Sequence, residues 1–315
     1  MVAFAGVAIL IGVLGGCSAA TPQTGGGSGG TDSGGAGVAT AGLSRVDIAR
    51  TVDIGGGREL YLECRGSGSP TVVLISGTGG AADEWTTEVD TADAAAPPTP
   101  STRSVFDTLA RTGRVCAYDR PGTTVMSGGA VPSTPVVQPT SARQGVDDLH
   151  ALLSAVHETG PIVVVGASWG GMIAQLYARE HPHDVRGIVL VDSASVFLTQ
   201  TFTPTQWTNW INVIADAHAK SPDAESPDYD ASVAEFTASA AMPDIPATVL
   251  SSDHPWDLAV TPGQSTWPAW LAAQASLAQS LHATHVSKTD SGHGIAVEQP
   301  ALVASAIRDV VTRSR

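Results

Sequence analysis

The sequence predicts an α/β fold in which a mostly parallel central sheet is flanked by helices. From about residue 45 the chain alternates short apolar runs with longer helix-like stretches, the pattern of strand-helix-strand units. The clearest unit joins the apolar run "PIVVV" at 161–165 to a helix-like stretch at 169–180 through a turn rich in glycine. The 315 residues, 43% of them hydrophobic, suffice for one large domain and a tail.

The order of the elements follows from hydrophobic patterning. The segments "RVDIARTVDI" and "RELYLEC", joined by glycines 55–57, predict an opening hairpin. Short apolar runs predict further strands at 71–75, 114–118, 161–165, 186–191, 247–251 and 283–288. Helices are expected near 102–112, 140–158, 169–180, 267–281 and 299–313. Two stretches, 81–101 and 194–245, interrupt the alternation, and the second lies where a small lid over an active site can be inserted.

The N-terminus indicates export. Residues 1–16 are apolar and uncharged but shorter than the roughly 20 residues of a comfortable membrane span, as expected for a signal peptide. The sequence "LGGC" resembles a bacterial lipobox, which makes Cys17 the lipidated first residue of the mature protein, although no Lys or Arg precedes it. An uncleaved anchor is the alternative, and both place the domain outside the cytoplasmic membrane. The Gly/Ser/Thr-rich tract 18–44 is expected to be a disordered tether.

Composition excludes several classes of partner. The net charge of −14 argues against nucleic acid, because little would neutralise a phosphate backbone. No glycine-rich phosphate loop with a lysine is found, and His282 and His285 lack a third ligand spaced nearby, so neither a cofactor nor a metal is expected. With Cys17 used for lipidation, Cys64 and Cys116 predict a disulfide in an exported protein; two buried free thiols are the alternative.

The segment "VVVGASWGGM" at 163–172 contains the best candidate for a nucleophile. Glycines 166 and 170 permit a tight strand-to-helix turn that lifts Ser168 out of the fold, although such a turn can also carry an incidental serine. A serine hydroxyl needs a base to take its proton. His293, in a glycine-flanked loop after the last predicted strand, is the best candidate for that base.

Four motifs in this order resemble those of the α/β-hydrolase superfamily over nearly all of residues 45–315: "ISGTGG" at 75–80, "YDRPG" at 118–122, "GASWG" at 166–170 and "SGHGI" at 291–295. The resemblance implies the α/β-hydrolase fold and an oxyanion hole formed by the backbone N–H groups of Thr78 and Trp169. Ser76 departs from the histidine that the superfamily most often has there. Because the nucleophile position holds serine, similarity to the dehalogenases and epoxide hydrolases that use aspartate is not expected to extend to the reaction.

The acid that should orient His293 has more than one candidate. Asp192 ends the predicted strand "GIVLVD", and Asp253 follows the next strand, which is the more usual position in the superfamily. Asp253 lies very close to its strand end, and Pro255 stands where the acid is normally found, so Asp192 is preferred. Asp257 is a third possibility.

These residues predict a lipid-anchored or secreted serine hydrolase that cleaves a small-molecule carboxylic ester through an acyl-enzyme. Five of the seven tryptophans lie between residues 207 and 270, which favours an apolar pocket for small or medium acyl groups. Peptidase, lipase and C–C hydrolase activities of the same fold are alternatives. So is a non-catalytic binding lipoprotein of the cell envelope that keeps the hydrolase scaffold. Membrane contact is expected only through the lipid anchor.

Overall fold

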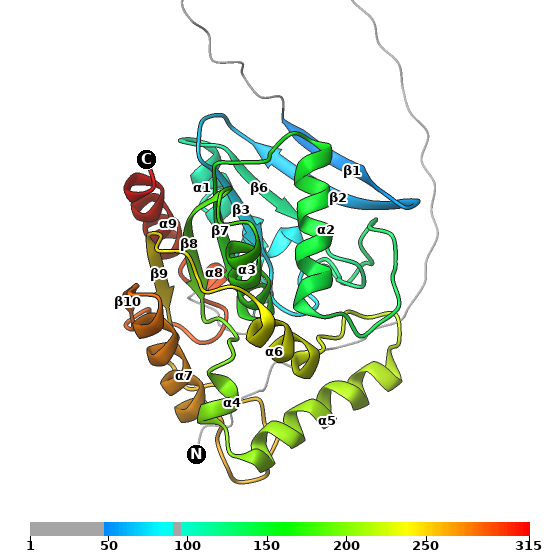
Figure 1. Cartoon of the computed structure of the whole chain (residues 1–315), viewed down its shortest axis with the longest axis vertical. Helices are drawn as coiled ribbons and strands as arrows, with labels where there is room; N and C mark the ends of the chain where they lie inside the picture. Colours follow the sequence, from blue (N-terminus) through cyan, green and yellow to red (C-terminus); the bar gives the residue numbers. More distant parts are fainter. Residues whose placement is uncertain (1–46, 91–95) are drawn as a thin grey trace, which may run out of the picture. The chain divides into compact units, whose positions relative to one another are not determined.

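The computed structural model describes residues 47–90 and 96–315. The predicted signal peptide 1–16, the lipidation site Cys17 and the tract 18–44 lie outside the described residues. Within them, an eight-stranded sheet forms the centre of the fold (Figure 1). Its strands in chain order are β1 Ile48–Gly55, β2 Arg58–Arg65, β3 Thr71–Ile75, β6 Val115–Tyr118, β7 Ile162–Ala167, β8 Val185–Val191, β9 Ala247–Leu250 and β10 Thr284–Val286.

The sheet has the spatial order β1-β2-β6-β3-β7-β8-β9-β10. The β1–β2 hairpin and the β2–β6 pair are antiparallel, and every later neighbouring pair is parallel. The hairpin turns at Gly55, Gly56 and Gly57, which have φ of 89°, 65° and 75°, a region that favours glycine. The fold class and the positions of all these strands agree with the sequence prediction.

Helices cover both faces of the sheet. Their bounds are α1 Val105–Ala110, α2 Ala142–Ala155, α3 Ser168–Glu180, α7 Trp267–Ser280, α8 Ile295–Glu298 and α9 Pro300–Arg313. The first of two hydrophobic clusters packs α2, α3 and α7 against one face, and the second packs α1, α8 and α9 against the other. The central strands are therefore buried on both faces, which explains their near-continuous apolar sequences.

Helix α3 is more deeply buried than its sequence pattern indicates. The pattern assigns only Met172, Ile173, Leu176 and Tyr177 to the sheet side, yet every residue from Trp169 to Ala178 is buried. The reason is that α3 packs against the sheet and against α2 at the same time. The small residues of the helix, including Gly170 and Gly171, make this close packing possible.

The segment between β8 and β9 (residues 194–245), called the insertion below, contains α4 Leu198–Thr201, α5 Pro204–Lys220 and α6 Tyr229–Ala238. In Figure 1 these helices lie at the bottom of the view, away from the β1–β2 hairpin at the top. A capping box formed by Thr203 and Gln206 begins α5, and the Asp228 side chain caps α6. The other interruption folds into a short 3-10 helix, Ala82–Thr86, and a small two-stranded sheet of β4 Thr87–Glu88 and β5 Thr99–Pro100.

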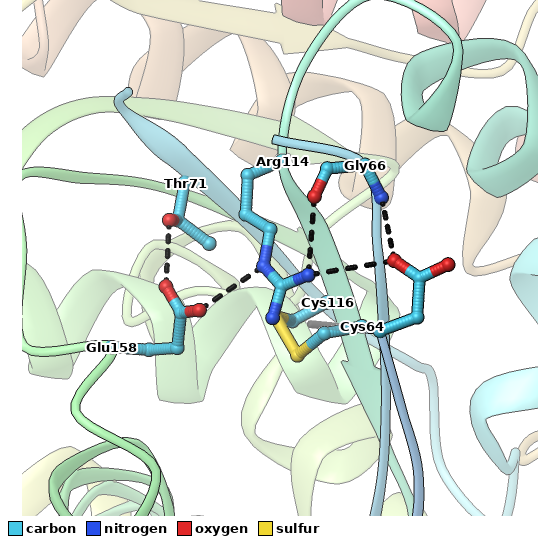
Figure 2. Close-up of a disulfide and its surroundings, with 7 residues drawn as sticks. Cys64, Gly66, Thr71, Arg114, Cys116 and Glu158 are labelled. Carbon is cyan, nitrogen blue, oxygen red and sulfur yellow. Dashed lines mark hydrogen bonds and ion pairs between the residues drawn. A yellow bond between two sulfur atoms is a disulfide. The ribbon is translucent and has the colours of Figure 1, made fainter. Parts of the chain in front are cut away.

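A disulfide joins Cys64 of β2 to Cys116 of β6, where the two residues lie directly opposite each other (Figure 2). A buried ion pair lies close by, with Arg114 Nε 3.0 Å from Glu158 Oε1. The hydroxyl of Thr71 donates to the same carboxylate at 2.9 Å. Arg114 Nη1 also donates to the Gly66 carbonyl, just after β2, at 3.1 Å, so a covalent bond and a polar contact both attach β2 to the parallel part of the sheet. Among the described helices, none is both long and apolar enough to cross a membrane.

Candidate active site

Ser168 occupies a sharp turn between β7 and α3. Its φ is 48°, in the left-handed region that residues other than glycine seldom adopt. A Cβ on Gly166 would overlap the backbone of Gly170, and a Cβ on Gly170 would overlap the backbone of β3, so both positions need glycine. Ser168 is therefore the first residue of α3 and lies in a strained turn directly after a buried strand. The residue itself is only half-buried.

Asp192 follows the last residue of β8 and is fully buried. Its Oδ2 lies 2.7 Å from Nδ1 of His293. Its Oδ1 accepts hydrogen bonds from the backbone N–H of Ser252 at 3.0 Å and from the Ser252 hydroxyl at 3.2 Å. Such hydrogen bonds offset the cost of burying a carboxylate. The geometry therefore pairs the preferred acid with the predicted base.

The other two aspartates serve the loops around the site. Asp253 accepts hydrogen bonds from the Ser291 N–H at 3.1 Å and the Thr289 hydroxyl at 3.3 Å, two residues of the loop that carries His293. Burial acts to raise the pKa of Asp253, but these hydrogen bonds outweigh it and lower the pKa. Asp257 accepts from Ala259 and Thr266. Among the contacts of the described residues, neither carboxylate reaches His293.

Two tryptophans flank the His293 ring. The Trp256 ring centroid lies 4.2 Å from that of His293, and the Trp270 centroid lies 5.5 Å from it. Trp256 Nε1–H also donates to the Ser252 hydroxyl at 2.9 Å. A chain of contacts thus runs from Trp256 through Ser252 and Asp192 to His293 and back to Trp256, which restricts the orientation of the imidazole.

Ser168 and Asp192 are connected through the backbone, since the Ala194 N–H donates to the Ser168 carbonyl at 2.9 Å. The hydrogen bonds of the described residues include none between the Ser168 hydroxyl and His293. Catalytic hydrogen bonds of this kind often tighten only once substrate is bound.

The loop after β3, residues 76–80, passes beside the nucleophile, because a Cβ on Gly77 would lie 3.3 Å from the Ser168 Cβ. In this loop the Gly77, Gly79 and Gly80 N–H groups all donate to acceptors within the protein. The Thr78 N–H has no acceptor among the described residues, and a first-turn N–H such as that of Trp169 has no partner within its own helix. Among the described residues, neither of the two expected oxyanion donors thus has a recorded acceptor.

Several site residues carried no recognisable signal in the sequence. Ser252 donates to Asp192, from which it is separated by 60 residues along the chain. Trp256 contacts the His293 ring. Glu84 accepts from the Gly77 N–H at 2.9 Å. Burial raises the pKa of Glu84, against the opposing effects of this hydrogen bond and of Arg120. Only the "YDRPG" motif pointed to Arg120, without indicating what it contacts.

One cluster of potential metal ligands lies apart from these residues. His150, His181 and Asp184 place one ligand atom each within 4.8 Å of one another. The two imidazoles are stacked, with an interplanar angle of 9° and centroids 4.1 Å apart. Ring-nitrogen lone pairs lie in the ring planes, so those of two nearly parallel stacked rings do not converge on one ion. His285, of the H-x-x-H pair, is hydrogen-bonded to Ser251 at 2.9 Å.

Comparisons with known proteins agree with the fold of the chain. The sequence pattern described as "Alpha/beta hydrolase family" matches residues 72–307. An uncharacterised protein of Schizosaccharomyces pombe is 36% identical over 83 residues, which span 26% of this chain and only 14% of that relative.

Solved structures resemble the chain over most of its length. They include a thermophilic esterase from Thermogutta terrifontis, with 20% identity, a TM-score of 0.52 and coverage of 86% of this chain and 98% of that one. An enol-lactonase from Burkholderia xenovorans has 20% identity, a TM-score of 0.52 and coverage of 83% and 99%. A haloalkane dehalogenase from Agrobacterium tumefaciens has 16% identity, a TM-score of 0.52 and coverage of 85% and 97%. At such identities the likeness establishes the fold, and together with the family match it shows that the chain is an enzyme of the alpha/beta hydrolase family.

Proposed function

We propose that this hydrolase cleaves carboxylic esters, with Ser168 as nucleophile, His293 as general base and acid, and Asp192 as the acid that orients His293. The observation that carries the proposal is the 2.7 Å contact between Asp192 Oδ2 and His293 Nδ1. Asp192 and Ser168 follow the carboxyl ends of the neighbouring strands β8 and β7, and Ser168 occupies a strained turn there. A buried carboxylate on Nδ1 fixes the tautomer that leaves Nε2 free to accept a proton.

The reaction would proceed in two steps. His293 Nε2 takes the proton of the Ser168 hydroxyl while Oγ attacks the ester carbonyl carbon, and the Thr78 and Trp169 N–H groups receive the negative charge on the carbonyl oxygen. The bond to the leaving oxygen then breaks, and His293 returns the proton to the departing alcohol. Water, deprotonated by His293, attacks the acyl-enzyme and releases the carboxylic acid and free Ser168.

The surroundings of His293 favour an uncharged, apolar acyl group. Trp256 and Trp270 contact its ring, and Trp210 of the insertion lies 6.3 Å from Trp270 between ring centroids. Tyr229 continues this aromatic group to Trp169, with ring centroids 5.0 Å apart. Aromatic side chains around a reacting group bind apolar groups through area burial and offer little to offset the desolvation of a charge. We therefore infer a preference for neutral esters of small or medium acyl groups.

The direct test is hydrolysis of p-nitrophenyl esters of increasing acyl length by the full chain. We expect turnover, with a preference for acetate to hexanoate over longer chains and over a succinyl ester of similar size. Ser168→Ala should abolish turnover, whereas Ser101→Ala, a serine outside the site, should leave it unchanged. Turnover that survives in Ser168→Ala, or an absence of turnover across the whole ester series by folded protein, would contradict the proposal.

We also propose that the enzyme lies outside the cytoplasm and is attached to the membrane by a lipid on Cys17. Its support is the lipobox-like sequence before Cys17 and the disulfide between Cys64 and Cys116, a bond typical of oxidising compartments. Expression of the full chain in a bacterium with intact lipoprotein processing should give an acylated mature N-terminus at Cys17 by mass spectrometry. Recovery of an unacylated chain that begins at residue 1 would contradict this.

A further inference from the structure

The insertion contributes a charged side chain to the interior beside the oxyanion loop (residues 76–80). Glu225, between α5 and α6, is buried, and its side chain is 2% exposed. It forms a two-point ion pair with Arg120: Nε lies 2.5 Å from Oε1 and Nη2 lies 3.0 Å from Oε2. Arg120 is equally inaccessible, with its side chain 4% exposed. A buried pair of this kind is a costly way to stabilise a fold, which raises the question of what it positions.

Both partners of the pair also bind the oxyanion loop. Glu225 Oε2 accepts a hydrogen bond from the Gly79 N–H at 2.6 Å, and Arg120 Nη2 donates to the Gly77 carbonyl at 2.7 Å. These contacts hold the peptide groups on either side of Thr78. Glu84 holds the Gly77 N–H from the other direction at 2.9 Å.

The consequence is a specific assignment of the N–H groups in the loop. The Gly77 N–H is taken by Glu84, the Gly79 N–H by Glu225 and the Gly80 N–H by the Gly77 carbonyl. Thr78 alone in this run keeps an N–H without an acceptor among the described residues. The Thr78 N–H belongs to the 77–78 peptide group, whose carbonyl Arg120 binds. Glu225 holds both Arg120 and the following 78–79 peptide group, so the pair sets the direction of the donor.

The segment that carries Glu225 is itself fixed to the body of the enzyme. The Glu225 N–H donates to the Gly122 carbonyl at 2.8 Å, and a Cβ on Gly122 would overlap the backbone at Glu225. One residue on, the Ser226 N–H donates to Gln138 Oε1 at 3.0 Å and the Ser226 carbonyl accepts from Thr140 at 2.9 Å. Glu225 is therefore held on both sides, as a residue that positions another group must be.

We propose that Glu225 is a positioning residue for the oxyanion hole: together with Arg120 it fixes the peptide groups around Thr78, so that catalysis depends on a side chain of the insertion. This inference rests on the proposed function. Burial would by itself lower the pKa of Arg120, but the Glu225 carboxylate outweighs it and raises the pKa, so Arg120 keeps its positive charge.

The test compares Glu225→Gln with the matched control Glu235→Gln, which alters another carboxylate of the insertion. The concentration of active enzyme is first determined by titration of the reactive Ser168, so that unfolded molecules do not lower the kcat that is calculated. Glu225→Gln keeps the shape but weakens both hydrogen bonds, and we expect kcat to fall about 10- to 100-fold, short of the hundredfold to thousandfold typical of losing an oxyanion donor outright. KM should change less than threefold, and Glu235→Gln should stay within twofold of wild type in both constants.

A transition-state analogue separates positioning from general damage. An alkyl boronic acid forms a tetrahedral adduct with Ser168, and its inhibition constant should rise in Glu225→Gln in proportion to the loss of kcat/KM. Should Glu225→Gln fail to fold, Glu225→Asp keeps the charge but is one methylene shorter, and we expect it to lose kcat at least fivefold. A folded variant of either kind with kcat within twofold of wild type would overturn the inference.

Hydrogen exchange distinguishes this inference from the proposed function. In a peptide covering residues 76–81, Glu225→Gln should lose protection at the Gly79 amide while Glu235→Gln does not, whether or not any ester is hydrolysed. A wild-type enzyme without esterase activity would contradict the proposed function alone. Unchanged protection of the Gly79 amide in Glu225→Gln would contradict the positioning role alone.

Discussion

Two residues of the candidate site adopt backbone conformations that most side chains avoid. Ser168 has φ of 48° and Asp192 has φ of 40°, and each follows immediately on a strand of the parallel sheet. Strain of this kind persists only where the surroundings over-determine it, and it is typical of functional sites. At Asp192 the surroundings are the Ser252 hydrogen bonds and the backbone bond from the Asp192 N–H to the Leu250 carbonyl at 2.8 Å.

At this scale the sequence predicted the residues with a local signature and left open those without one. Ser168 and His293 could be named from glycine-flanked motifs, because a tight turn leaves a pattern in the chain. The sequence favoured Asp192 but left Asp253 and Asp257 as alternatives, because both Asp192 and Asp253 follow a strand and the path of the His293 loop in space leaves no pattern in the chain. Ser252 and Glu225 left no pattern, since their roles depend on contacts between distant segments.

The two strand-end aspartates give opposite expectations on substitution. Asp192→Asn removes the charge that stabilises the imidazolium and allows the wrong tautomer, so we expect kcat to fall on the order of 10³- to 10⁴-fold with the fold intact. Asp253→Asn touches only the hydrogen bonds to Thr289 and Ser291, so kcat should stay within about fivefold of wild type. Steady-state kinetics on both variants checks this. Equal losses in the two would contradict the assignment of the acid.

At the scale of elements, strands were predicted more accurately than helix faces. Runs such as "TVVLI" and "PIVVV" are buried on both sides and therefore read as continuous apolar sequence. The burial of helix α3 was underestimated because its second packing partner is α2. That helix lies one strand earlier in the chain and cannot be inferred from the pattern of α3 alone. The insertion lies between β8 and β9, and its contacts with the oxyanion loop depend on the tertiary fold.

The disulfide between β2 and β6 gives a prediction about the stability of these elements. Cys64 and Cys116 are separated by 52 residues, so the bond should contribute about 2–4 kcal/mol to the free energy of unfolding. Urea unfolding of wild type against Cys64→Ala/Cys116→Ala measures it. A thiol assay on denatured, unreduced protein should find at most one reactive thiol, that of Cys17. Detection of three thiols would show that Cys64 and Cys116 are not joined.

At the scale of the whole molecule, one buried carboxylate should shape the dependence of stability on pH. Burial raises the pKa of Asp119 to about 6, the charge of Asp83 adds to this, and the hydrogen bond from the Ala82 N–H opposes it. The unfolded group has a pKa of about 4, so between pH 4 and 6 the folded state binds more protons than the unfolded state. The contribution of Asp119 to stability therefore decreases as the pH rises through this range.

In wild type the Ala82 N–H donates to Asp119 Oδ1 at 2.7 Å. Replacement of Asp119 by Asn isolates the contribution of the charge, because the amide oxygen can still accept this hydrogen bond but is uncharged. We expect the free energy of unfolding of Asp119→Asn, taken relative to that of wild type, to increase by on the order of 2–3 kcal/mol from pH 4 to pH 7. Urea unfolding at the two pH values measures the difference. A gap between variant and wild type that is the same at both pH values would show that Asp119 ionises normally in the folded state.

The proposed reaction requires Ser168 to be an activated nucleophile, and treatment of the folded enzyme with a fluorophosphonate probe tests this most directly. We expect a single covalent adduct, located at Ser168 by mass spectrometry, that does not form on protein denatured beforehand or in Ser168→Ala and that forms much more slowly in Asp192→Asn. A folded wild-type enzyme that forms no adduct, or one that is labelled equally well without Ser168, would contradict it.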